Sequence, residues 1–176
     1  MRLTRPVSYR KARRLAPMTT IIPATLSPRE LAEEVRKLTA TPREWMARVR
    51  LSAEGRWYER IHVDGQYEVW LISWLPGQAT GFHDHGGSAG AFGVVFGTLE
   101  EHQAGTPQRR HAVSAAPVSA GRIRSFGPEY IHDVRNTSEA VAVSVHAYSP
   151  PLAEMTRYDM IEGSLTRLDT EEAGQW

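Results

Sequence analysis

The chain has 176 residues and a mass of 19.7 kDa, which is the size of one ordinary domain. Hydrophobic residues make up 41% and charged residues 23% of it, as in globular proteins, and no stretch approaches the roughly 20 apolar residues of a membrane span. The sequence contains no cysteine, which excludes disulfides, zinc fingers, thiolate nucleophiles and iron–sulfur clusters. Any metal ion must therefore be bound by histidine, carboxylate or carbonyl groups.

The formal net charge of +1 is the sum of two unlike parts. Residues 1–17 hold six of the 21 basic residues and no acid, which leaves 15 basic against 20 acidic residues from Met18 onward. Basic tails occur in nucleic-acid-binding and targeted proteins, but no apolar run follows Arg13 and Arg14 as an export signal requires. We expect a disordered leader over residues 1–17, a single domain over 18–176 and a cytoplasmic location.

Two short helices are expected first, over about residues 28–52. Residues 27–30 (SPRE) form a capping-box pattern with proline at the first helical position, and apolar residues recur at helical spacing up to residue 39. Residues 41–44 (TPRE) repeat this start signal and predict the second helix.

From Trp57 onward, short runs of aromatic and β-branched residues alternate with turn residues, which is typical of a β-rich domain. The predicted strands cover residues 57–63, 67–75, 81–84, 91–102, 109–114, 122–126, 131–135 and 140–148. About eight strands over residues 57–150 favour a sandwich or a small barrel. Periodicity is lost after Pro151, so residues 151–176 are expected to be a C-terminal segment that packs on the barrel.

The candidate metal ligands are histidines. His83 and His85 are two residues apart and share a face if they lie in a strand, and His132 lies in a later predicted strand. An H-x-H pair alone fits a surface pair equally well. The string Gly77-x5-His83-x-His85, Gly97, Gly121 and His132-x3-Asn136, however, resembles the two cupin motifs. This resemblance implies an all-β jelly-roll barrel whose histidines converge on one metal ion.

The glutamate ligand of the first cupin motif is missing. Its position falls at Ala89 and Gly90, which cannot coordinate a metal. Three neutral imidazoles leave the charge of a divalent ion uncompensated, whereas a site with two histidines and one carboxylate offsets part of it. Such a site favours an anionic, chelating substrate such as a thiolate.

Longer motifs resemble the cysteine dioxygenases of the thiol dioxygenase family. The resemblance runs in order over about residues 30–165, and its most specific part is the Ser-x-His-x-Tyr-Ser-Pro-Pro ending. The matching segments are residues 58–64, 82–90, 95–100, 130–136 and 144–151. The resemblance implies Fe(II) bound by His83, His85 and His132, and addition of both atoms of O2 to the sulfur of L-cysteine to give cysteine sulfinic acid.

The resemblance also implies roles for the residues around the metal. Ser144, His146 and Tyr148 occupy alternate positions of one strand, so a hydrogen-bonded line is expected on one face, with Tyr148 beside the metal. The alternative is a polar ladder that only stabilises the strand. Arg60 is expected to bind the substrate carboxylate through its planar guanidinium, with Tyr58 shaping that end of the pocket and Trp74 lining it. Relatives acting on 3-mercaptopropionate generally carry glutamine in place of this arginine.

Gly90 is the main departure from the family pattern. Animal members carry a cysteine there, which forms a thioether with the active-site tyrosine, so Tyr148 is expected to be unmodified. His62 is weighed for substrate contact, while His102 and His111 are expected to be solvated.

Two other functions stay open. The first is a dioxygenase for another small thiol such as 3-mercaptopropionate, and the second is a non-catalytic cupin sensor or binding module that holds a metal or ligand in the same pocket. Zinc also binds well to three histidines. The expected partners are a small thiol and O2, with no nucleic acid or membrane, and the protein is expected to be a monomer.

Overall fold

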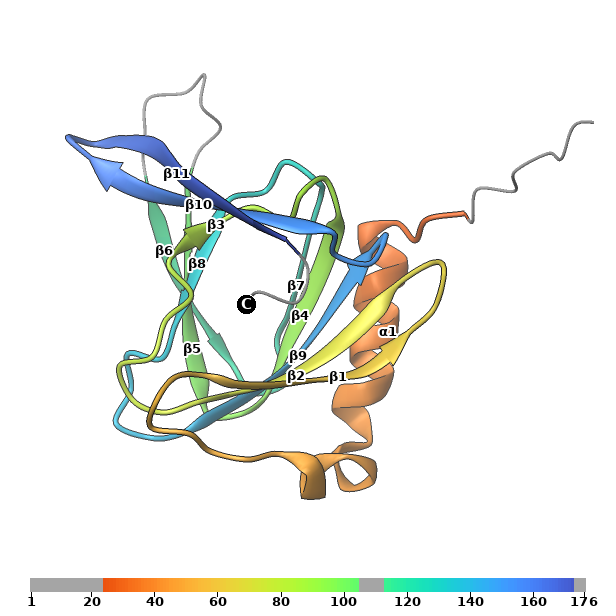
Figure 1. Cartoon of the computed structure of the whole chain (residues 1–176). Coiled ribbons are helices and arrows are strands. Elements are labelled where there is room, and N and C mark those ends of the chain that lie inside the picture. Colours follow the sequence, from red (N-terminus) through yellow and green to blue (C-terminus); the bar gives the residue numbers. More distant parts are fainter. Residues whose placement is uncertain (1–23, 105–112, 173–176) are drawn as a thin grey trace, which may run out of the picture.

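The computed structural model describes residues 24–104 and 113–172. Within these ranges the chain forms one α-helix, two 3-10 turns and 11 strands, which build two facing antiparallel sheets (Figure 1). The helix is α1 (Pro28–Ala40), and the strands are β1 (Trp57–Val63), β2 (Glu68–Trp74), β3 (Phe82–His83), β4 (Ala89–Phe96), β5 (Thr98–Gln103), β6 (Ser114–Ser119), β7 (Ile123–Phe126), β8 (His132–Arg135), β9 (Ala142–Ser149), β10 (Glu154–Ile161) and β11 (Ser164–Glu172). The expected leader over residues 1–17, His111 and most of the strand predicted over 109–114 lie outside the described residues.

The first predicted helix is confirmed and the second is wrong. Ser27 caps α1, and its capping box with Glu30 is formed. The second start signal yields only two 3-10 turns, Pro42–Glu44 and Met46–Arg48, because Trp45 between them leaves the helical conformation. Its ring is buried and its Nε1 donates to the carbonyl of Leu38 at 3.0 Å, so tertiary anchoring overrides the local pattern.

The helix covers one sheet and thereby fixes which face of that sheet is the interior. The five-stranded sheet has the order β1-β2-β9-β4-β7, and α1 packs on its outer face (Figure 1). Along β9, Val143, Val145 and Ala147 join the core under α1, whereas Tyr148 joins the core between the sheets. Strand alternation therefore turns the residues at 144, 146 and 148 into the barrel.

The strand predicted over residues 91–102 is in fact two strands in different sheets. The chain turns at Gly97, which has a φ of 75°, and passes from β4 into β5 of the six-stranded sheet β11-β10-β3-β8-β5-β6. A Cβ at this position would lie 2.5 Å from the carbonyl oxygen of Val141, so only glycine fits the corner.

The C-terminal segment, expected only to pack on the barrel, does so as the β10–β11 hairpin, whose strands were not predicted. Glu162 and Gly163 both have positive φ, as a tight hairpin turn requires. β10 pairs with β3 and sets Arg157 opposite His83, so this strand completes the wall beside the metal ligands. None of the helices in the described part of the chain is long and apolar enough to cross a membrane.

Candidate metal centre and active site

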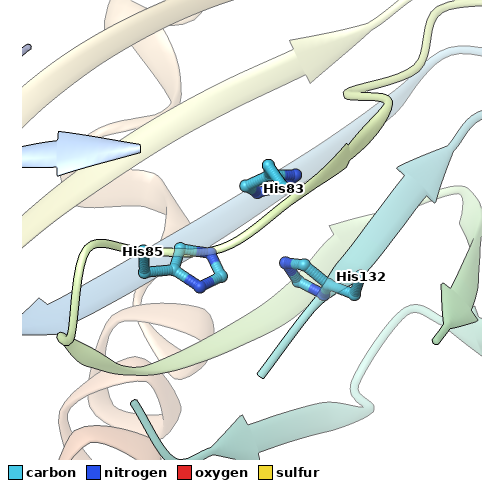
Figure 2. A group of neighbouring side chains, drawn as sticks. All are labelled: His83, His85 and His132. Carbon is cyan, nitrogen blue, oxygen red and sulfur yellow. The ribbon is translucent and has the colours of Figure 1, made fainter. Parts of the chain in front are cut away.

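Three histidines converge inside the barrel. His83 on β3 pairs in register with His132 on β8, and His85 follows two residues after His83. Figure 2 shows the three rings directed toward a common space. One ligand nitrogen from each ring lies within 4.8 Å of the others, and all three side chains are buried. The histidines expected to share a metal are thus brought together by the pairing of β3 and β8.

Hydrogen bonds orient two of the rings. The Nδ1 of His83 lies 2.9 Å from the carbonyl of Gly81, and the Nδ1 of His132 lies 2.8 Å from Glu101 Oε1. Both partners only accept hydrogen bonds, so each Nδ1 carries the proton and each Nε2 keeps its lone pair for a metal. Both nitrogens of His85 are buried without a hydrogen-bond partner, which is costly for a polar group unless a ligand completes it. The donor set therefore fits a metal ion.

The rings of His83 and His85 are neutral, as metal ligands must be. Burial lowers the pKa of His83 well below its ordinary value, and the neighbouring His132 adds to this effect. Burial also lowers the pKa of His85, with further contributions from His83 and His132. Protons therefore do not compete for these lone pairs at neutral pH.

Glu101 on β5 was missed by the sequence reasoning. Its buried carboxylate accepts from His132, and from the hydroxyl of Tyr130 at 3.1 Å, and Arg124 lies 3.4 Å away. Ala89 and Gly90 have no side-chain group that could bind a metal. Glu101 is not part of the three-histidine cluster, so it acts through His132 rather than through its own oxygens. The signal was present, because Leu99 and Glu101 alternate onto the inner face of the strand.

Ser144, His146 and Tyr148 form a continuous line of hydrogen bonds on the inner face of β9. Ser144 Oγ lies 2.8 Å from His146 Nε2, and His146 Nδ1 lies 3.2 Å from Tyr148 Oη. The indole Nε1 of Trp74 on β2 donates to Ser144 Oγ at 2.9 Å and extends the line across the sheet.

The indole at the end of this line fixes the direction of one hydrogen bond. Because an indole N–H only donates, Ser144 accepts from Trp74. The serine hydroxyl keeps its own hydrogen and a second lone pair, so its contact with His146 Nε2 can run in either direction, and His146 correspondingly donates to or accepts from Tyr148. The line therefore connects the buried indole to the phenol that borders the cavity.

The pKa values preserve this arrangement. Burial lowers the pKa of His146 to about 3, with smaller contributions from His132 and Arg56, so its ring is neutral. Burial and the charge of Glu68 raise the pKa of Tyr148, which Arg56 partly offsets, so the phenol stays protonated. Tyr148 is therefore a hydrogen-bond donor at neutral pH.

His83, His132, His146 and Tyr148 border a cavity of about 110 Å³. At 10–15 Å³ for each water centre, this is room for roughly seven to eleven water-sized groups, which suits a small molecule. The polar lining residues are Arg56, Tyr58, Thr80, His83, His132, His146, Tyr148 and Arg157. The apolar ones are Trp70, Ile72, Val134, Leu152 and Met155.

Of the residues expected to bind substrate, only Tyr58 lines this cavity. Arg60 lies outside the lining, and its Nη1 forms an ion pair with the buried Glu68 at 3.2 Å. Trp74 is fully buried behind the lining, where it supports Ser144. Arg56 and Arg157, which the sequence reasoning did not single out, line the cavity instead.

Gly90 lies beside Tyr148 in the pairing of β4 and β9. A Cβ at Gly90 would be 2.4 Å from the ring of Phe126 and 3.0 Å from Tyr148. The ring of Phe126 thus occupies the space that a side chain at position 90 would need, and with no cysteine in the chain Tyr148 carries no thioether.

Two further histidines of the described residues, His62 and His102, lie apart from the cavity lining. His62 is half-buried, contacts Asp64 at 3.3 Å and packs against Tyr67. His102 lies 2.5 Å from Glu100. Neither contributes to the metal cluster of the described residues.

Fold and site together define an all-β cupin with a three-histidine metal centre. The chain is similar in structure to the TT1209 protein from Thermus thermophilus, with a TM-score of 0.52 and 21% identity over 60% of this chain and 94% of that one. It also resembles a Klebsiella pneumoniae protein with a double-stranded beta-helix domain, with a TM-score of 0.50 and 19% identity over 69% of this chain and 90% of that one. These similarities concern the fold alone.

Sequence similarity identifies the family. Residues 3–161 match the family described as cysteine dioxygenase type I. The chain is 28% identical to cysteine dioxygenase type 1 of Danio rerio over 145 residues, which cover 74% of this chain and 71% of that protein. The chain belongs to the cysteine dioxygenase type I family.

Proposed function

We propose that the protein is an iron-dependent thiol dioxygenase that adds both atoms of O2 to the sulfur of L-cysteine and releases cysteine sulfinic acid. The observation that carries this proposal is that His83 and His132 of the three-histidine cluster and the phenol of Tyr148 line one small cavity. Membership in the cysteine dioxygenase family supports it. The reaction is balanced, because a thiol and O2 supply all the atoms and electrons of the sulfinic acid.

His83, His85 and His132 would hold Fe(II) through one nitrogen each. The ion would supply coordination for a thiolate and for dioxygen, and it would lower the thiol pKa without a separate base. The three ligands are neutral, so an anionic substrate is needed to offset the charge of the ion.

The side chains of the protein orient the substrate and control its hydrogen bonds. Tyr148 donates its hydrogen to the substrate sulfur or oxygen, while His146 and Ser144 fix the position of the phenol. Leu152 and Met155 form an apolar wall that limits water at the reacting sulfur. Tyr58 closes the side of the cavity that borders β1.

A second candidate substrate is 3-mercaptopropionate. The sequence feature that favoured cysteine was Arg60, and this residue is paired with Glu68 outside the cavity lining. Comparing initial rates of the iron-loaded protein with the two thiols selects between them.

The test of the proposed function is oxygen consumption by the iron-loaded protein with L-cysteine, together with mass spectrometry of the product. We expect a sulfinic acid that carries two labelled atoms from ¹⁸O2. His132→Ala should abolish both metal binding and turnover, whereas His62→Ala, outside the lining, should retain them. Normal turnover by His132→Ala, or thiol binding without oxygen consumption by the wild-type protein, would contradict the proposal.

A further inference from the structure

Arg56 is unusual among the arginines of the described residues. Four of them are half-buried, and three of the four have a carboxylate partner. The three pairs are Arg124 with Glu101, Arg135 with Asp133, and Arg157 with Glu171. Arg56 makes neither an ion pair nor a hydrogen bond with any residue in 24–104 or 113–172; its guanidinium carbon lies 5.3 Å from the ring centre of Trp74. Its charge therefore has no direct carboxylate partner among the described residues.

The position of Arg56 connects this charge to the active site. The residue directly precedes β1 and lines the same cavity as His83 and Tyr148. Arg157 lines that cavity as well, but its guanidinium is held by the carbonyl of Thr80 at 3.0 Å and by Glu171 at 2.8 Å. Burial and the nearby Arg157 lower the pKa of Arg56, and the charge of Asp133 offsets only part of this effect.

The geometry around Arg56 leaves its hydrogen-bond donors free. The guanidinium carbon lies over the ring of Trp74, and none of the five N–H donors forms a hydrogen bond or ion pair with the described protein groups. A planar fork of this kind matches a carboxylate with two parallel hydrogen bonds. An anion bound here would also offset a half-buried charge that is otherwise costly.

Arg60 is in the opposite situation. It is exposed, its guanidinium carbon lies 5.3 Å from the ring centre of Trp70, and it neutralises Glu68. The carboxylate of Glu68 is buried and also accepts a hydrogen bond from the backbone N–H of Leu152 at 3.1 Å. Removing this arginine would leave a buried carboxylate without its charge partner. Arg60 thus has a structural task outside the cavity lining.

Building on the proposed function, we propose that Arg56 binds the carboxylate of the thiol substrate and that Arg60 instead stabilises Glu68. The sequence alone favoured Arg60, because the family motif includes it and because nothing in the local pattern shows that Arg56, outside the strand, turns into the cavity. The inferred ligand class is a small thiol with a carboxylate.

The test compares Arg56→Gln with Arg60→Gln on two thiols, L-cysteine and cysteamine, which lacks the carboxylate. For Arg56→Gln we expect KM for L-cysteine to rise about 10- to 100-fold, as expected for the loss of charge-assisted hydrogen bonds, while kcat/KM for cysteamine stays within about threefold. For Arg60→Gln we expect KM for L-cysteine to change by less than about threefold and thermal stability to fall.

A binding measurement separates this inference from the proposed reaction. Anaerobic calorimetry of L-cysteine on the metal-loaded protein should show the same 10- to 100-fold loss for Arg56→Gln, and Arg56→Lys should recover part of it because it keeps the charge. If the wild-type protein binds L-cysteine through Arg56 but consumes no oxygen with any thiol, the proposed function fails and the inference stands. The inference is overturned if turnover is normal but Arg60→Gln weakens the binding of L-cysteine and Arg56→Gln does not. It is also overturned if cysteamine binds the wild-type protein as tightly as L-cysteine.

Discussion

A methyl group at Gly90 should destabilise the protein, because neighbouring side chains converge on its Cα. The added Cβ of Gly90→Ala would lie 2.4 Å from two ring atoms of Phe126 and 3.0 Å from Tyr148. Phe126 cannot yield cheaply, since its buried ring stacks on His85 and on Tyr130, each at 4.8 Å between centres. Relief of the clash therefore moves either a metal ligand or the active-site tyrosine.

The expected size of the effect follows from core overpacking, which typically costs about 1–3 kcal/mol. For a chain of this length, each 1 kcal/mol lowers the melting temperature by about 2–4 °C, so we expect a fall of about 2–12 °C for Gly90→Ala. Differential scanning fluorimetry of the metal-free protein measures this term without contributions from metal binding. Gly90→Cys should show at least the same loss, and intact-protein mass spectrometry should find no thioether while Phe126 holds its place.

Gly55→Ala is the matched control, because Gly55 has no atom within 4 Å of a built Cβ and no positive φ. It should change the melting temperature by no more than about 2 °C. A Gly90→Ala protein as stable as this control would refute the reasoning, since it would mean that the Phe126 ring moves freely. A loss that Phe126→Leu partly restores in the double variant would identify the ring as the source of strain.

Two further substitutions test the groups that support the site. Glu101→Gln keeps the shape of the side chain but removes the negative charge of the group that accepts the His132 hydrogen bond. Metal affinity, measured by titration, should therefore fall about 10- to 100-fold. Unchanged affinity would show that Glu101 does not tune this ligand. Trp74→Phe keeps an aromatic ring under Arg56 but removes the hydrogen-bond donor to Ser144. We expect kcat to fall about five- to tenfold while KM for L-cysteine stays within twofold. Equal changes in kcat and KM would point to a general loss of structure.

Much of the fold was predictable because it depends on local chemistry. The capping box at Ser27 and the alternation along β1, β2 and β9 fixed the bounds of these elements to within about two residues. The errors arose where tertiary contacts decide. Trp45 breaks the second helix to reach Leu38, and the corner at Gly97 divides one apolar run between two sheets. The β10–β11 hairpin was missed because its outer strand is mostly exposed and shows little apolar alternation.

The candidate site divides in the same way. The spacing of His83, His85 and His132 was sufficient to predict a cluster, because strand pairing brings such positions together. Arg157 reaches the site through pairing between strands distant in sequence, which no local pattern encodes. The alternation along β5 does turn Glu101 inward, but it does not show that His132 will lie beside it. A sequence also cannot show whether a carboxylate from another strand already neutralises an arginine. Arg60 is neutralised in this way by Glu68, whereas Arg56 has no such partner among the described residues.

The absence of cysteine raises the question of what holds Tyr148 in place of a covalent bond. Tyr148 stacks on His85 at 5.0 Å between ring centres, and His85 stacks in turn on Phe126. Phe126 stacks on Tyr130, whose hydroxyl donates to the carboxylate that orients His132. Gly90 is necessary to this arrangement, because any side chain there would displace the Phe126 ring. The tyrosine and two of the three metal ligands are therefore positioned by one continuous series of ring contacts and hydrogen bonds, which substitutes packing for a crosslink.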